Sequence, residues 1–218
     1  MRGALVFDLD GTLIDSAPDI HAACARMLAD YGHAPLPPDR IQAFVGNGAP
    51  KLVERVMGAV GVTSGHADWL ARFLAHYEAD PATLTRPYPG VAEALEELAG
   101  AGHALGLCTN KPEAPARAIL RHFGMDQLFS VVIGGDSTPH AKPHPAPLLE
   151  AARRLGVPPE ACAYVGDDHR DVIAGRAAGM ATVAAGWGYL GAGEAIGDWG
   201  ADIVIDAPHA LLHWLELA

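Results

Sequence analysis

Short apolar runs recur along the chain, and each ends in polar or glycine residues that lead into a helix-like segment. Within a run the apolar positions are continuous and do not alternate with polar ones. This pattern is typical of strands buried on both faces of a parallel sheet that helices cover. The alternation of strands and helices predicts an α/β doubly wound, Rossmann-like core. The expected strands are residues 4–7, 104–108, 131–133, 162–165, 182–185 and 202–205.

One region departs from this alternation, because its periodicity is helical throughout. Ser16 and Asp19 at its start have the S-x-x-D spacing of a capping box. A run of helices between the first and second strands predicts a small helical cap inserted into the core. The expected helical stretches are residues 20–31, 40–45, 51–60 and 69–77.

These patterns divide the chain into a discontinuous core of residues 1–15 and 88–218 and a cap of residues 16–87. Hinges are expected near residues 15–16 and 87–90, where Pro and Gly set up a turn. Closure of the cap on the core would exclude water from the space between them.

Composition narrows the class of partner. The formal net charge is −11 and there is no Lys or Arg run, so we expect no nucleic-acid partner. No apolar stretch approaches the roughly 20 residues that span a bilayer, and Asp8 comes too early for a signal peptide, so we expect no membrane partner. Cys24, Cys108 and Cys162 lack metal or redox spacing and are expected as buried thiols of a cytoplasmic protein.

Polar residues gather where the expected strands end, which is where open α/β sheets bind ligands. Lys142, in the stretch AKPHP, is expected at the start of a helix in the same region. These residues form one constellation if the sheet forms as predicted. The strand ends carry Asp8-Leu9-Asp10-Gly11-Thr12, Thr109-Asn110-Lys111 and Gly166-Asp167-Asp168, with Asp171 just beyond.

Such a set suits phosphoryl transfer. Asp8 is the candidate nucleophile, and Asp10, two residues along an extended segment, is the candidate general acid and base. Crowded carboxylates that face a phosphate require a hard cation with oxygen ligands, so we expect Mg²⁺, with Asp167 completing its site. Lys142 is expected to neutralise charge on the transferring phosphoryl group.

Smaller groups are expected to hold the phosphate: Gly11 by close approach, Thr12 and Thr109 through their hydroxyls, and Asn110 beside them. Taken alone, each motif has an ordinary structural role. A D-x-D sequence is usually a turn, Thr-Asn often caps a helix, and a single lysine is usually a surface charge. Only their conjunction favours an active site.

With these residues assembled, DLDGT, CTN, the Lys142 of AKPHP and GDDHRD resemble the four motifs of the haloacid dehalogenase superfamily of phosphohydrolases. The resemblance implies that Mg²⁺ is held by the Asp8 side chain, the Asp10 main-chain carbonyl and Asp167. It also implies that Asp171 supports the metal's waters or the lysine, and that the inserted helices are the family's cap. Motif four more often has Ser or Thr where this chain has Asp168, which adds a negative charge near the site.

More narrowly, FVGNG, YPGV, TNKP, VVIGGD, KPHPAPLL and YVGDD are similar to segments of bacterial phosphoglycolate phosphatases. This resemblance implies a small phosphorylated metabolite, 2-phosphoglycolate, as the substrate of a monomer or homodimer. Amides at a helix start, aided by basic side chains, are expected to hold its carboxylate, although an ordinary loop is the alternative. The cap residues expected to take part are Gly46, Asn47, Gly48, Lys51 and Arg55.

Two other functions remain open. A phosphatase or mutase for another small sugar phosphate, such as N-acetylmuramic acid 6-phosphate, would share all four motifs, because the cap discriminates between substrates. A non-catalytic binding module is the alternative from a different class. The clustered carboxylates argue against it, since they are costly without a cation or proton.

Overall fold

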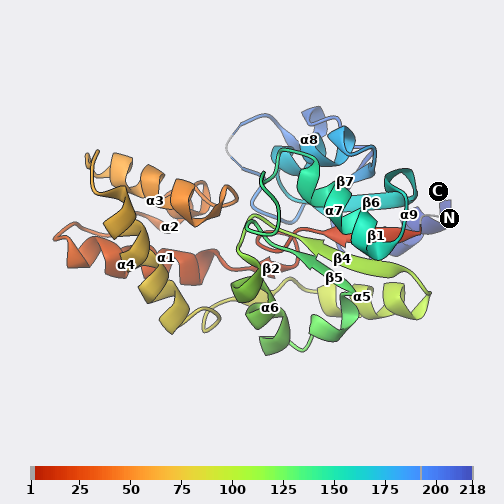
Figure 1. Cartoon of the computed structure of the whole chain (residues 1–218), viewed down its shortest axis with the longest axis horizontal. Helices are drawn as coiled ribbons and strands as arrows, with labels where there is room; N and C mark the ends of the chain where they lie inside the picture. Colours follow the sequence, from red (N-terminus) through yellow and green to blue (C-terminus); the bar gives the residue numbers. More distant parts are fainter. Residues whose placement is uncertain (1–2, 192, 218) are drawn as a thin grey trace.

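The computed structural model describes residues 3–191 and 193–217, and its core is a six-stranded parallel sheet in the order β5-β4-β1-β6-β7-β8 (Figure 1). This is the doubly wound order in which the chain builds one half of the sheet and then crosses to the other. The predicted fold class is confirmed, and each expected strand is correct to within one residue. The strands are β1 (Ala4–Phe7), β4 (Ala104–Cys108), β5 (Val131–Ile133), β6 (Cys162–Gly166), β7 (Ala181–Ala185) and β8 (Ile203–Ile205).

Two layers of helices bury the sheet. Leu5 and Phe7 of β1 join a core cluster on one face, and Ala4 and Val6 join another on the opposite face. Both faces of β1 are therefore apolar, which explains its unbroken hydrophobic run. The first face is covered by α5 (Val91–Gly100), α6 (Glu113–His122) and α9 (Ala210–Leu217), and the second by α7 (Ala146–Leu155) and α8 (His169–Ala177). Short 3-10 helices lie at Asp126–Leu128, Pro159–Ala161 and Ile196–Asp198.

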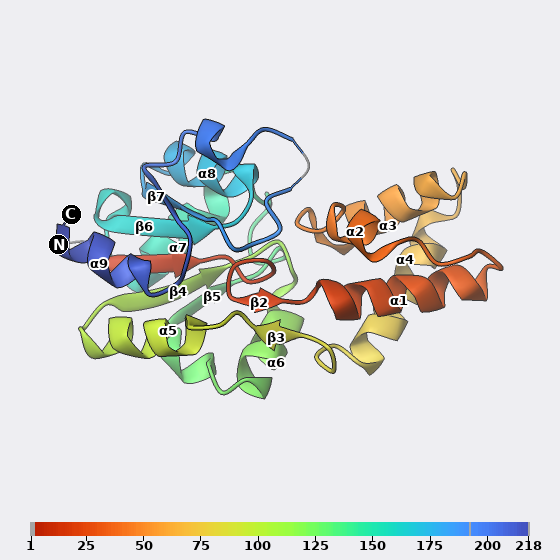
Figure 2. The same cartoon turned by 180° about the vertical axis from the view of Figure 1, so that it is seen from behind.

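A helical unit lies to one side of the sheet, beyond one end of its strands (Figure 2). Its helices pack around their own apolar cluster, in which Val53, Val56 and Phe73 are buried. Two short antiparallel strands of two residues each, β2 (Ile14–Asp15) and β3 (Arg86–Pro87), join this unit to the core. The sequence pattern did not predict them, because two residues are too few to show a period. The helices are α1 (Ala17–Asp30), α2 (Pro38–Gln42), α3 (Gly48–Ala59) and α4 (His66–Ala79).

The predicted capping box at the start of α1 is wrong. Ser16 is the N-cap residue, but its side chain makes no cap hydrogen bond. Its hydroxyl donates instead to Oδ1 of Asp10 at 2.5 Å. The buried carboxylate of Asp19 accepts from the backbone N–H groups of Leu84 and Thr85. These two partners of Asp19 lie 65 and 66 residues away in sequence, so the local S-x-x-D spacing could not predict them.

Cys24, Cys108 and Cys162 are buried and free. Burial raises the pKa of the Cys24 and Cys108 thiols to about 12, which makes both poor nucleophiles. Among the residues that the structure describes, no helix combines the length and the apolar character needed to cross a bilayer.

Candidate active site

The polar residues predicted from the strand ends do meet, at the carboxyl edge of the sheet where the strand order reverses. Asp8 follows β1, Thr109 follows β4 and Asp167 follows β6, and β1 lies between β4 and β6. Parallel strands bring their carboxyl ends to one edge, so three motifs far apart in sequence converge there.

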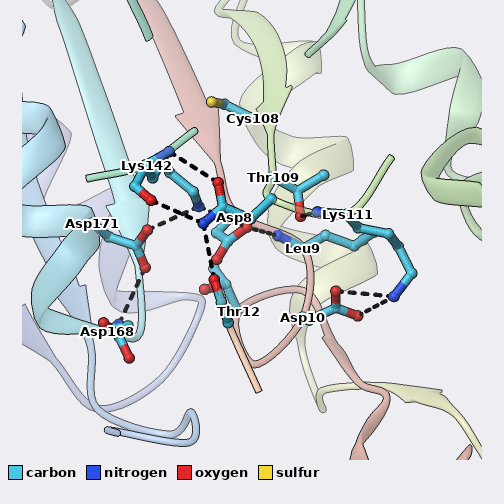
Figure 3. Close-up of polar contacts among 12 residues, drawn as sticks. Asp8, Leu9, Asp10, Thr12, Cys108, Thr109, Lys111, Lys142, Asp168 and Asp171 are labelled. Carbon is cyan, nitrogen blue, oxygen red and sulfur yellow. Dashed lines mark hydrogen bonds and ion pairs between the residues drawn. The ribbon is translucent and has the colours of Figure 1, made fainter. Parts of the chain in front are cut away.

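Lys142 holds two carboxylates together (Figure 3). Its Nζ lies 2.9 Å from Oδ1 of Asp8 and 2.9 Å from Oδ1 of Asp171, and it donates to the Tyr164 hydroxyl at 2.6 Å. Burial alone would lower the pKa of Lys142, but the two carboxylates outweigh it and the pKa is raised. Lys142 is therefore a permanent cation.

The predicted helical position of Lys142 is wrong, because the residue lies in the loop between β5 and α7, and α7 begins only at Ala146. The loop is braced by Asn110, whose Oδ1 accepts from the Lys142 backbone N–H at 3.0 Å. Tyr164 of β6 supports the ammonium group through its hydroxyl. No spacing signal links either residue to Lys142, although both lie at or near strand ends.

Asp8 has an unusual charge environment for a carboxylate. Burial raises its pKa to about 6, and the attraction of Lys142 offsets only part of that effect. Its Oδ1 accepts from the backbone N–H of Leu9 at 2.8 Å, which fixes the side chain on the strand end. The single positive charge of Lys142 does not neutralise the three carboxylates of Asp8, Asp167 and Asp171.

Asp8, Asp167 and Asp171 form a buried cluster in which one carboxylate oxygen of each lies within 4.8 Å of the others. Burial, together with Asp171 and Asp8, raises the pKa of Asp167 well above its usual value. Hard divalent cations prefer oxygen ligands, and this cluster offers oxygens and excess negative charge, so the residues fit Mg²⁺. Sequence reasoning had placed Asp171 in a supporting role, whereas the structure gathers it with the candidate ligands.

Thr12 and Gly11 shape the position of Asp167. The Thr12 hydroxyl donates to Oδ1 of Asp167 at 2.7 Å, and the Tyr189 backbone N–H donates to Oδ2 at 2.8 Å. Thr12 thus contacts a carboxylate here and not an open phosphate position. Gly11 has a φ of +89°, and a Cβ at this residue would lie 2.1 Å from Oδ2 of Asp167. Only glycine allows that approach.

Asp10 is held by Lys111, a residue of the strand-end constellation to which the sequence assigned no role. Lys111 Nζ donates to Oδ1 and Oδ2 of Asp10 at 2.9 and 3.0 Å. Figure 3 shows the Asp10 carboxylate turned toward Lys111 and not toward Asp8. The signal that could have found Lys111 is its position at the end of the second predicted strand, directly after Thr109 and Asn110.

Thr109 and Asn110 connect the motifs. The Thr109 hydroxyl oxygen accepts from the Lys111 backbone N–H at 3.2 Å. The Asn110 side-chain amide donates to the carbonyl of Gly46, in the helical unit, at 2.9 Å and to the Lys142 carbonyl at 3.1 Å. Asn110 therefore bridges the sheet edge and the loop that precedes α3.

A cavity of about 180 Å³ lies between the sheet edge and the helical unit, and Asp8, Asp10 and Lys111 line it. Of the five predicted cap residues, Gly46 and Gly48 line this cavity. Asn47 and Arg55 line a separate one, and Arg55 donates to the Phe44 carbonyl at 2.9 Å. Lys51 is exposed and pairs with Glu54 at 2.7 Å. The structure therefore brings neither basic cap residue to the cavity that Asp8 lines.

The extra acid of motif four has a partner. Asp168 caps α8 by accepting from the Arg170 backbone N–H at 2.9 Å, and it accepts from the Arg170 guanidinium at 2.6 and 2.7 Å. Burial alone would raise the pKa of Asp168, but Arg170 outweighs it and the pKa is lowered. Arg170 also donates to the Val45 carbonyl at 3.3 Å. The added charge is neutralised locally by a contact that reaches the helical unit.

Comparison with known proteins agrees with this architecture. The family profile for haloacid dehalogenase-like hydrolases matches residues 5–185, so the chain belongs to that family. It is similar to a protein of Cereibacter sphaeroides named phosphoglycolate phosphatase, with 50% identity over 179 residues and 81% of each chain covered. A protein of the same name from Xanthomonas campestris pv. campestris is 44% identical over 215 residues, which cover 95% of this chain and 94% of that one.

Among solved structures, the fold is similar to that of a Haemophilus somnus 129pt protein called a predicted phosphoglycolate phosphatase. The TM-score is 0.92 at 31% identity, with 98% of this chain and 97% of the other covered. The helical unit and the core are therefore arranged as in that solved structure.

Proposed function

We propose that this protein is a Mg²⁺-dependent phosphatase that hydrolyses 2-phosphoglycolate to glycolate and phosphate. The observation that carries the proposal is the Asp8 carboxylate, which is buried against Lys142 and lines a cavity between the sheet edge and the helical unit. The names of the relatives at 44% and 50% identity support the choice of substrate.

In the proposed reaction an Asp8 oxygen forms a bond to phosphorus while the bond from phosphorus to the substrate's ester oxygen breaks. Asp10 gives a proton to the leaving oxygen. A water oxygen then attacks the phosphorus of the aspartyl-phosphate, its proton passes to Asp10, and the bond to Asp8 breaks. Lys142 offsets the charge that spreads over the phosphoryl oxygens. The predicted phosphate-binding residues are Gly11, Thr12, Thr109, Asn110 and Lys142.

We also propose which residues bind Mg²⁺. Asp8 and Asp167 are the proposed side-chain ligands, and the Asp10 main-chain carbonyl stays a predicted third ligand. Asp171 lies within the same acidic cluster and supports the ion or Lys142. When bound, Mg²⁺ would offset the charge of the carboxylates and of the phosphate.

The division into a core of residues 1–15 and 88–218 and a cap of residues 16–87 is also proposed, with the paired β2 and β3 as the connection. Asn110 and Arg170 reach from the core to carbonyls of residues 45 and 46, which supports a cap that closes over the cavity. A cytoplasmic monomer or homodimer without nucleic-acid or membrane partners completes the proposal. The buried free cysteines support a reducing compartment.

A kinetic screen tests the proposal. We expect kcat/KM for 2-phosphoglycolate to exceed that for sugar phosphates, N-acetylmuramic acid 6-phosphate included, and to require Mg²⁺. Rapid acid quench with labelled substrate should trap phosphate on the protein, and Asp8→Asn should abolish both the trapped label and turnover. A sugar phosphate that outperforms 2-phosphoglycolate would replace the substrate, and failure to trap label in an active protein would refute the covalent step.

A further inference from the structure

Lys111 occupies an unusual place for a lysine. Its side chain is only 8% exposed, and it extends from the loop after β4 into the space between Asp10 and Tyr77 of α4. Its Nζ lies 5.0 Å from the centroid of the Tyr77 ring. Burial by itself would lower the pKa of Lys111, but Asp10 and Tyr77 outweigh it and the pKa is raised, so Lys111 is charged.

Tyr77 supplies an independent observation at the same place. Its side chain is buried at 6% exposure, and its hydroxyl is the one buried side-chain oxygen or nitrogen, among the residues described, that has no hydrogen-bond partner of normal geometry, although it lies close enough to Lys111 to affect the pKa of that residue. A buried hydroxyl without a partner is costly, so such groups usually face a ligand or a water. Tyr77 lines the same cavity as Lys111.

The charges around this cavity are uneven. Among the described residues that line it, Lys111 is the only Lys or Arg, while Asp8, Asp10 and Glu78 are acids. Much of the remaining wall is apolar, with Ile20, Leu52 and Phe73 from the helical unit. A ligand anion in this cavity other than the phosphate therefore has one cationic partner. The cavity is also smaller than the roughly 300 Å³ at which pockets for drug-sized ligands begin, which favours a short ligand.

We propose that Lys111 and the Tyr77 hydroxyl bind the carboxylate of the substrate, and that this binding draws Lys111 away from Asp10. The exchange releases Asp10 from its two hydrogen bonds to the ammonium group, so that its carboxyl can turn to the leaving oxygen. An ester without a carboxylate leaves the Lys111 to Asp10 pair intact and is turned over more slowly. The inference rests on the proposed phosphatase function and deepens it by naming the residues that select the substrate.

The test compares two short esters in the full-length protein with Mg²⁺. These are 2-phosphoglycolate and 2-hydroxyethyl phosphate, in which a neutral hydroxymethyl group replaces the carboxylate. Lys111→Met should lower the ratio of their kcat/KM values by about 10- to 100-fold, the range for loss of a hydrogen bond to a charged group. The loss should appear mainly as a higher KM for 2-phosphoglycolate, while kcat for 2-hydroxyethyl phosphate should rise, because Asp10 no longer pairs with an ammonium group. Lys111→Arg should restore much of the ratio, since it restores the charge.

Two further variants separate this role from a general loss of positive charge and from carboxylate binding by Lys51. Arg26→Met removes a positive charge from an exposed ion pair with Asp80 and should leave the ratio as in the wild type. Lys51→Met tests the rival assignment of the carboxylate to the cap lysine. A lower ratio in Lys51→Met with an unchanged ratio in Lys111→Met would overturn the proposal. Circular dichroism checks that each variant is folded.

Tyr77→Phe gives a second measurement if Lys111→Met fails to fold. It should lower the same ratio by about threefold or more, because it removes one hydrogen bond to the carboxylate and leaves the charge of Lys111 in place. If kcat/KM falls equally for both esters in every Lys111 and Tyr77 variant, these residues do not bind the carboxylate and have only a structural role. In that case an intact preference of the wild type for 2-phosphoglycolate leaves the proposed function standing. A wild type inactive on both esters refutes the two proposals together.

Discussion

The ammonium nitrogen of Lys142 lies 2.9 Å from Oδ1 of Asp8. Only 2% of the Lys142 side chain and 12% of the Asp8 side chain are exposed, so the ion pair is largely shielded from water. The same nitrogen contacts Asp171, which makes Lys142 the cation between two buried acids. The stability of this edge of the sheet therefore depends on its charge balance.

Lys142→Met should lower the free energy of unfolding in metal-free buffer by about 3–5 kcal/mol, the cost of removing one partner from a buried ion pair. Urea denaturation in EDTA measures it. Added Mg²⁺ should restore part of the loss, because a cation again lies among the carboxylates. Lys51→Met, whose ion pair with Glu54 is exposed, should leave the urea midpoint unchanged. Equal midpoints for Lys142→Met and wild type would refute the expectation.

The stability of the metal-free protein should depend on the protonation of Asp8. Its pKa is about 6 in the folded protein against 3.8 for the ordinary group, so the folded state holds this proton more tightly. The stabilisation is complete below pH 4 and is lost as the pH rises through 6. A shift of about two pKa units corresponds to about 3 kcal/mol.

Asp8→Asn cannot titrate at this position, so its free energy of unfolding relative to wild type should increase by up to about 3 kcal/mol between pH 4 and pH 7. Urea denaturation of both proteins in EDTA, at several pH values across this range, gives the difference directly. A difference that is constant with pH would contradict the raised pKa of Asp8.

Mg²⁺ should raise the melting temperature of the wild type, and the rise should grow with the logarithm of its concentration above the dissociation constant. Binding to the folded state alone contributes about 2.7 kcal/mol at a concentration 100 times the dissociation constant. Asp167→Asn should lose most of this shift, because it removes a charge from the buried acidic cluster. The matched control is Asp30→Asn, whose carboxylate pairs with His76 on the helical unit. The metal site is misplaced if both variants keep the wild-type shift.

Gly11→Ala should lower kcat/KM by about 100-fold or more, because a Cβ lying 2.1 Å from Oδ2 of Asp167 displaces that carboxylate. Gly90→Ala is the control, since its φ of +81° imposes the same backbone strain while its Cβ would meet no atom within 4 Å. Steady-state kinetics and Mg²⁺ titrations should separate the two. Similar kinetics for both would show that backbone strain, and not the contact with Asp167, is responsible.

Several features of the fold were visible in the sequence because they depend on local composition. The first strand was predicted at its observed bounds, since a strand covered on both faces needs an unbroken apolar run. The helices α1 to α4 were predicted to within three residues from their apolar stripes. The β2 to β3 pairing and the partners of Asp19 were missed, because they involve segments distant in the chain. The hydrogen bond from Ser16 to Asp10 was missed because it depends on how the chain turns after β1.

Some residues of the candidate site were likewise predicted from the sequence, and others were recognised only in the structure. The convergence of Asp8 and Asp167 was predicted because strand ends meet at one edge of a parallel sheet. Lys142 was expected beside them from a helix start, but it reaches them from the loop between β5 and α7. Lys51 was predicted to help hold the substrate carboxylate because it lies near a helix start, and Lys111 was assigned no role. The direction of a side chain depends on what packs around it, and the structure turns Lys51 toward Glu54 and Lys111 toward Asp10.

By itself, the sequence determined the order of strands and helices, the insertion of a helical unit and the set of acids at the strand ends, because periodicity and chain order carry that information. Tertiary structure alone decided which charges are paired, that Asp171 joins Asp8 and Asp167, and that Lys111 faces the cavity. The physical reason is that burial and electrostatics act between atoms brought close by folding. Contacts between residues distant in the chain leave no periodic pattern in the sequence, so the sequence alone does not reveal them.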